Sequence, residues 1–195
     1  MNQPNGFQEF IAEVRAVMLR ESPARDTLRA LTPGFGRLLA NRTFLDDEIR
    51  KLGATADEVC LYHDRDCDFV VLARGVSRGS TRKGASHAAM PHDHGPLWAL
   101  YGLYEGSARL QRYAPDPDAS DAPFPGLRLL SDTPSETGAI DAIEPYNMHL
   151  PVFPENGGNV IIVVYSKPLG KVERRGYVAA RKGVVKFRGA FPPME

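Results

Sequence analysis

The chain has 195 residues, of which 43% are hydrophobic and 25% charged, with 24 basic and 24 acidic side chains. Balanced charge gives no global field that would favour nucleic acid or an anionic membrane, and no apolar run is long enough to span a membrane. The length suits one domain, residues 1–195, and two cysteines do not indicate a disulfide scaffold.

The amino-terminal part is expected to be helical. Apolar side chains recur at helical spacing over residues 7–20. A second helix is predicted from Ala24 to Leu31, because the residue before Pro33 avoids the helical region. A third is predicted from Thr43 to Leu52, so residues 1–56 would form a helical cap. The first ten residues lack a basic start and an apolar core, so we expect no secretory signal and a cytoplasmic location.

The pattern changes after Asp57 to short apolar runs bounded by Gly, Pro, Asn and Asp, which are typical of strands. Gly106 stands at a hairpin-like break between two of them. The runs cover residues 59–62, 69–73, 97–104, 108–113, 159–165, 172–179 and 184–187. A mainly β fold follows, with residues 57–195 forming a sandwich or barrel beneath the helical cap.

The segment Pro91-His92-Asp93-His94-Gly95 is the strongest chemical signal. Side chains alternate along an extended segment, so His92 and His94 point to one side while Asp93 points to the other. Neutral imidazoles bind divalent transition metals, and His149 is the candidate third donor. A solvated loop that binds no metal is the alternative reading of the His-x-His string.

Two strings together are similar to the two motifs of the cupin superfamily, and in particular to cysteine-dioxygenase-type thiol dioxygenases. The first is PHDHGPLWALYGLYEGSARLQRY, residues 91–113, in which Gly106 matches the glycine of the turn. The second is IEPYNMH, which ends at His149. The resemblance covers residues 57–170 and implies a cupin double-stranded β-helix, a jelly-roll barrel.

The resemblance also implies a non-haem Fe(II) site held by His92, His94 and His149, with O2 and a small-molecule substrate as partners. Zn, Ni and Mn are alternative metals, because three imidazoles accept several ions. General cupins add a glutamate a few residues after the His-x-His pair, but Gly95 to Ala99 cannot coordinate through their side chains. Without that carboxylate, an anionic, chelating substrate would be favoured, because it supplies the missing charge.

Tyr165 matches the tyrosine that lies close to the iron in cysteine dioxygenases, and the resemblance implies that it donates a hydrogen bond there. Val163 and Ile161 replace the histidine and serine of that family's relay. Candidate substrate-binding residues are Tyr62, Arg74 and Trp98. Asp64 stands two residues after Tyr62, where the family has its carboxylate-binding arginine, so cysteine itself is a doubtful substrate.

These observations predict a dioxygenase of the thiol-dioxygenase type that acts on a small, anionic substrate. The lost relay and Asp64 motivate an alternative, a metal-binding cupin that senses or binds a small molecule or acts as an isomerase without O2. A barrel that has lost its metal is a third reading. The sequence leaves the substrate and the oligomeric state open.

Overall fold

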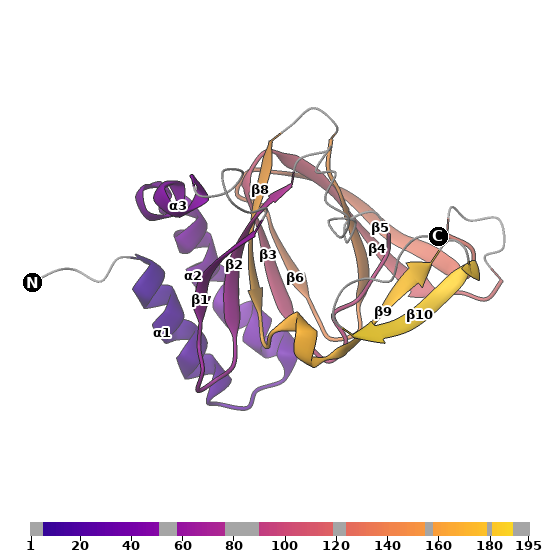
Figure 1. The fold of residues 1–195 in the computed structure, drawn as a ribbon, viewed down its shortest axis with the longest axis horizontal. Helices are drawn as coiled ribbons and strands as arrows, with labels where there is room; N and C mark the ends of the chain where they lie inside the picture. Colours follow the sequence, from indigo (N-terminus) through magenta and orange to yellow (C-terminus); the bar gives the residue numbers. More distant parts are fainter. Residues whose placement is uncertain are drawn as a thin grey trace, which may run out of the picture.

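The structure is a computed structural model that describes residues 6–50, 58–76, 90–118, 124–154, 158–178 and 181–188. Three α-helices come first, and the strands follow (Figure 1). The helices are α1 (Gly6–Met18), α2 (Ala24–Ala40) and α3 (Arg42–Ile49). The strands are β1 (Glu58–His63), β2 (Val70–Val76), β3 (Ala99–Glu105), β4 (Ser107–Pro115), β5 (Leu127–Glu136), β6 (Ile140–Ile143), β7 (Met148–Val152), β8 (Asn159–Tyr165), β9 (Glu173–Val178) and β10 (Gly183–Arg188), with a 3-10 turn at Leu169–Lys171.

The three predicted helices are present, and α2 corrects one predicted boundary. It continues past Pro33 to Ala40 instead of ending at Leu31. Pro33 lies on the exposed side of the helix, where water can satisfy the carbonyl that the proline leaves unpaired. The buried side chains of Leu31, Phe35 and Leu38 extend the packed face across this point, and that packing outweighs the local preference. Leu52, the predicted end of the third helix, lies outside the described residues.

The strands form a jelly roll. One sheet has the order β1-β2-β8-β3-β6, and a second has the order β5-β4-β7. His92 extends the second sheet, because it pairs with His149 of β7 on one side and with Gly176 of β9 on the other. If β2, the His92 segment and β3 to β8 are numbered one to eight, the two sheets read 1-8-3-6 and 2-7-4-5, which is the arrangement of a jelly roll. The prediction of a mainly β jelly roll with an amino-terminal helical cap is confirmed.

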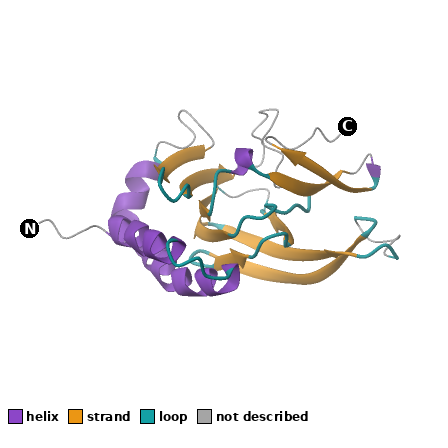
Figure 2. Cartoon of the chain, turned by 90° about the horizontal axis from the view of Figure 1, so that it is seen from below, coloured by secondary structure: helices purple, strands orange, loops and turns teal. Residues whose placement is uncertain are grey.

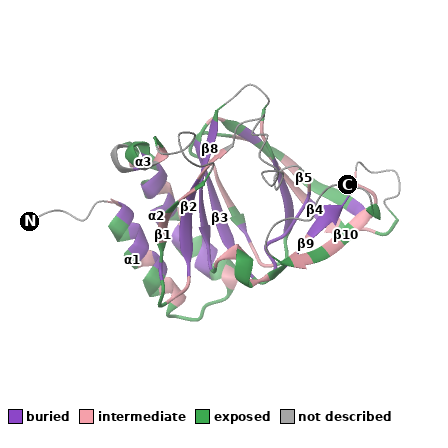
Figure 3. Ribbon diagram, viewed as in Figure 1, coloured by how far each residue is buried: buried purple, intermediate pink, exposed green. Residues whose placement is uncertain are grey.

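The helices cover one face of the five-stranded sheet, and the second sheet lies beyond its other face (Figures 1 and 2). Successive side chains of β8 therefore alternate between two cores. Ile162 and Val164 pack with the helices, whereas Ile161, Val163 and Tyr165 belong to the core on the opposite face of the sheet. Every residue of β8 is buried. In Figure 3 the buried residues, coloured purple, are concentrated on β2, β3 and β8. A strand buried on both faces reads as the continuous apolar run seen in the sequence.

Sequence patterns located seven of the ten described strands and missed β5, β6 and β7. Residues 159–165 were predicted as a strand and form β8. Strand β5 was not predicted, because most of its side chains are exposed and polar and carry no apolar alternation. Strands β6 and β7 have only four and five residues and were also missed. None of the described helices is both long and apolar enough to cross a membrane.

Candidate metal centre

Two backbone hydrogen bonds hold His92 beside His149. The His92 amide donates to the His149 carbonyl at 3.0 Å, and the His149 amide donates back to the His92 carbonyl at 2.8 Å. The motif segment is therefore a minimal strand between β7 and β9, although the pairing around His92 is limited to isolated bridges. Because His149 is placed by its sheet, the pairing fixes the side to which both rings project.

Asp93 points away from the imidazoles, as predicted, and anchors the segment to β9. Its carboxylate is fully buried and accepts hydrogen bonds from the amides of Gly95, at 2.9 Å, and Arg175, at 2.7 Å. The Arg175 guanidinium also donates to it. Three donors on one buried carboxylate leave it little freedom, so Asp93 sets the position of the histidines on either side of it.

Gly95 ends the segment in a backbone conformation that favours glycine. Its φ is 62°, and a Cβ placed there would lie 2.1 Å from the carbonyl oxygen of Glu173. No other residue fits between this turn and β9 without moving one of them. The glycine after the second histidine is therefore a steric requirement of the site.

The imidazoles of His92, His94 and His149 converge. One ring nitrogen of each lies within 4.8 Å of the others, and all three residues are buried. The Nε2 atoms of His94 and His149 are 3.4 Å apart. Nδ1 of His92 lies 3.0 Å from the Met90 carbonyl, and a neutral ring that donates this hydrogen bond carries its lone pair on Nε2.

The environment keeps the rings of His94 and His149 neutral. Burial lowers the pKa of both His94 and His149 well below the usual range, and the charge of His92 lowers it further. A neutral imidazole presents a lone pair, which is the form that coordinates a metal. Asp141 lies 4.0 Å from Nδ1 of His149, on the side away from His94, where carboxylates commonly orient ligating histidines.

The donor set fits a divalent transition metal. Three buried ring nitrogens face one another, and a cation between them would satisfy their lone pairs. Nδ1 of His94 is buried without a hydrogen-bond partner among the described residues, so the polar contacts of this ring are made by Nε2. Within the described ranges this is the one grouping of three or more possible ligands from His, Cys, Asp and Glu. Imidazole donors alone do not select Fe over Zn, Ni or Mn.

Two of the other predicted site residues lie beside the histidines. The ring of Tyr165 stands edge-on to His94 at 5.2 Å between centroids, and its hydroxyl accepts a 3.3 Å hydrogen bond from Arg74. The predicted relay partners, Val163 and Ile161, share the inner face of β8 but offer only apolar surface. Instead, the Tyr165 hydroxyl lies 2.5 Å from that of Tyr101 on β3.

The structure does not bring Tyr62 and Trp98 to the histidines. Both pack in the helix-side core, across the sheet from Tyr165. The Tyr62 hydroxyl accepts a hydrogen bond from Arg15 at 2.8 Å and donates one to Asp64 at 3.2 Å. Asp64 is itself buried in an ion pair with Arg15, so the charge expected to repel a carboxylate substrate is neutralised away from the site. Alternation along the strands sends these side chains to the helical face.

Sequence reasoning missed Tyr101 and Arg174. Tyr101 shares the inner face of β3 with Ala99 and Leu103, and the alternation of the predicted strand over residues 97–104 could have identified it. The buried Arg174 is on β9, and its charge contributes to lowering the pKa of His94. Nothing in the sequence distinguishes Arg174 from a surface arginine, because its burial depends on β9 closing over the His92 segment.

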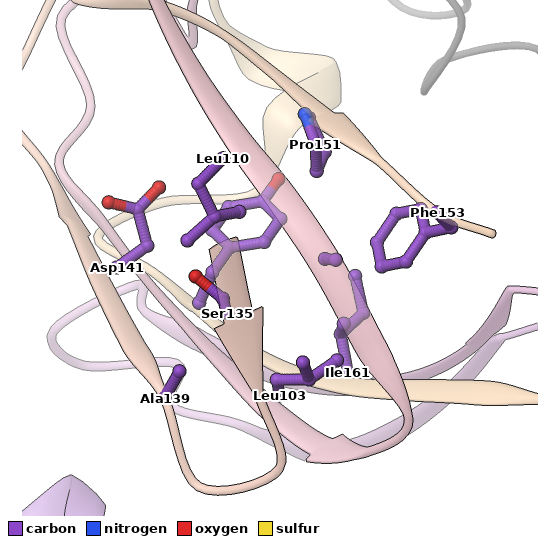
Figure 4. A pocket seen from close by; sticks show the side chains of 10 residues that line it. Leu103, Leu110, Ser135, Ala139, Asp141, Pro151, Phe153 and Ile161 are labelled. Carbon is purple, nitrogen blue, oxygen red and sulfur yellow. The ribbon is translucent and has the colours of Figure 1, made fainter. Parts of the chain in front are cut away.

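Two spaces are lined by neighbours of the three histidines, although neither lining includes a histidine. A small, mostly apolar cavity of about 20 Å³ lies between the sheets, and Tyr101 and Asp141 form part of its wall (Figure 4). It has room for little more than a water-sized molecule. An open groove of about 530 Å³ runs along β9 on the outside, and its lining includes Gly95, Arg174 and Arg175 with Lys171, Lys186 and Arg188.

Comparison with known proteins found solved structures of low similarity to this chain. No protein-family model matches the chain, and no curated protein matches it. A cupin-2 domain containing protein from Shewanella frigidimarina has 11% identity and a TM-score of 0.41, over 62% of this chain and 89% of that one. KdgF from Halomonas sp. has 13% identity and a TM-score of 0.38, over 57% and 78%. An oxalate oxidase has 12% identity and a TM-score of 0.38, over 57% and 51%. The case for a metal centre therefore rests on the convergence of the three histidines.

Proposed function

We propose that the chain is a cupin of the thiol-dioxygenase type, in which His92, His94 and His149 hold Fe(II). The observation that carries this proposal is the convergence of three buried imidazoles beside a tyrosine hydroxyl pair. Bound Fe(II) would supply the activation of O2 and coordination positions for the substrate.

The residues around the histidines favour a small, anionic substrate. The guanidinium charges of Arg174, Arg74 and Arg112 all reach His94 and lower its pKa, after burial and His92. Arg112 is paired with Asp141 and Arg74 with Glu58, whereas Arg174 also lines the basic groove outside β9. Arginines in a site of low dielectric stabilise a carboxylate or similar anion more strongly than they would in water. We assign Arg74 and Arg174 to substrate binding.

The tyrosines supply hydrogen bonds without the relay found in the resembled family. Arg74 donates to the Tyr165 hydroxyl, which in turn shares a hydrogen bond with the Tyr101 hydroxyl beside the histidines. Burial at Tyr165 is complete, which excludes water from this hydrogen bond. Tyr165 would thus hold a proton at its Oη next to the reacting groups.

The test is anaerobic loading with Fe(II), followed by measurement of bound iron and of O2 uptake with a panel of small thiols, with and without a carboxylate. The expected result is one iron per chain and uptake that is fastest with a carboxylate-bearing thiol. His92→Ala should lose both iron and uptake. His63→Ala is the matched control, because His63 is partly exposed and pairs with Asp68 outside the site. Iron binding without uptake for any thiol would refute the dioxygenase assignment.

A second candidate is a metal-binding cupin without oxygenase activity, favoured by the apolar side chains of Val163 and Ile161 at the relay positions. Zinc or nickel that stays bound through native purification, with no oxygen-dependent turnover after iron loading, would support it.

A further inference from the structure

The Tyr101 hydroxyl lies at ligand spacing from one of the three histidines. Nitrogen or oxygen donors about 2.1 Å from one ion are about 3.0 Å apart at a right angle and about 3.4 Å apart at the tetrahedral angle. The Nε2 atoms of His94 and His149 meet this condition at 3.4 Å. The hydroxyl oxygen of Tyr101 meets it too, at 3.2 Å from Nε2 of His94.

The ring of Tyr101 is held so that its hydroxyl stays at this point. It lies parallel to the His94 ring, with 6° between the planes and 5.6 Å between centroids. It is edge-on to His149, at 5.3 Å. Tyr101 is buried on β3, in the sheet opposite His149, so its hydroxyl approaches the imidazoles from the other side of the barrel.

The Tyr165 hydroxyl lies behind that of Tyr101 as seen from the ring nitrogens of the histidines. Its hydroxyl is 2.5 Å from that of Tyr101 and accepts a hydrogen bond from Arg74, while its contact with His94 is between rings. In this chain of hydrogen bonds, Arg74 donates to the Tyr165 oxygen, and a deprotonated Tyr101 would accept the hydrogen bond that joins the two hydroxyls. Such a chain ends on a negative oxygen more favourably than on a neutral one.

We propose that Tyr101 is the fourth protein ligand of the metal and binds it as a phenolate. This inference rests on the three-histidine metal site of the proposed function and deepens it. When the ion binds, the O–H bond of Tyr101 breaks, a metal–oxygen bond forms, and the proton passes to solvent. The phenolate supplies the single negative charge that a general cupin takes from glutamate. Two octahedral positions then remain for a substrate donor and O2.

A phenolate bound to Fe(III) gives a strong charge-transfer absorption in the visible, which imidazole ligands alone do not give. The experiment loads wild type, Tyr101→Phe, Tyr165→Phe and His92→Ala with Fe(II), oxidises the bound iron to Fe(III), and records iron content and visible spectra. Wild type and Tyr165→Phe should both be coloured, with the maximum shifted in Tyr165→Phe because the phenolate loses a hydrogen-bond donor. Tyr101→Phe should retain iron, with an affinity lowered at least tenfold, and should lack the band.

Resonance Raman spectra of the wild type, excited within the band, should show tyrosinate vibrations, and this readout does not depend on any variant folding. Iron bound by the wild type without a visible band would overturn the inference and leave the three-histidine centre intact. A band lost in Tyr165→Phe and kept in Tyr101→Phe would assign the ligand to Tyr165 and also overturn it. If the wild type binds no iron, the metal centre fails and the inference fails with it.

Discussion

Replacing Asp93 by alanine should damage both the stability of the fold and the metal centre, although Asp93 touches no metal ligand atom. The carboxylate is buried and accepts hydrogen bonds from the amides of Gly95 and Arg175 and from the Arg175 guanidinium. Removing one partner of a buried ion pair costs about 3–5 kcal/mol. Each of the two amides left unsatisfied adds about 1–3 kcal/mol where water cannot replace the lost acceptor.

The expected loss is therefore about 3–6 kcal/mol, since relaxation of the Gly95 turn recovers part of the sum. That is a large part of the stability of an ordinary domain, roughly 5–15 kcal/mol. Asp93→Asn keeps an acceptor for the amides and should lose less, about 1–3 kcal/mol. In both variants the affinity for the metal should fall about 10- to 100-fold, the usual cost of removing a group that positions ligands.

Urea unfolding of the apoprotein measures the first effect, and a competitive metal titration measures the second. Asp132→Ala is the matched control, because Asp132 also accepts from an arginine, Arg109, but at the surface, so its loss should change stability little and leave metal affinity unchanged. The reasoning would be refuted if Asp93→Asn bound the metal as tightly as wild type and unfolded at the same urea concentration.

Three further predictions concern Gly95, Asp64 and Tyr62. Gly95→Ala should lower the melting temperature and weaken metal binding, because its Cβ would collide with the Glu173 carbonyl; unchanged melting would show that the turn relaxes freely. Burial raises the pKa of Asp64, but hydrogen bonds from the Cys67 amide and from Arg15 lower it more, so the net shift is downward. The stability from Asp64 is therefore complete above about pH 4 and lost as pH falls through the folded-state pKa. Asp64→Asn should unfold more easily at pH 7 and show a smaller loss on acidification, and parallel pH curves for the two proteins would contradict this. Tyr62→Phe should lower stability by about 1 kcal/mol and leave metal affinity as in wild type, and a tenfold loss of affinity would place Tyr62 in the site after all.

The sequence predicted the parts of the fold that depend on periodicity. Periodicity predicted the amphipathic helix over residues 7–20 and the strand over residues 159–165, because each pattern buries its apolar side chains in only one type of secondary structure. The end of α2 was not predictable in this way. Local chemistry at Pro33 favoured a stop, and tertiary packing of the residues beyond it decided otherwise.

In the candidate site, too, local patterns were predictable from the sequence and long-range pairing was not. His92, His94 and the opposite direction of Asp93 follow from alternation along an extended segment. The neighbourhood of Tyr101 and Tyr165 depends on the pairing of β3 with β8, where Ala99 is opposite Tyr165, and sequence alone does not set this register. Tyr62 was predicted in the site from the family resemblance, and Trp98 because it closely follows the His-x-His pair. The fold sends them to the other face of the sheet.

The hydrogen bonds between Asp93 and Arg175 join residues 82 positions apart, so they form only after most of the chain has been synthesised. A chain growing on the ribosome exposes the His-x-His pair long before the strand that secures it has been made. Closing so long a loop is slow compared with forming helices or hairpins. We therefore expect the newly made chain to acquire its ion after β9 has docked, so that metal uptake marks the completion of folding and does not initiate it.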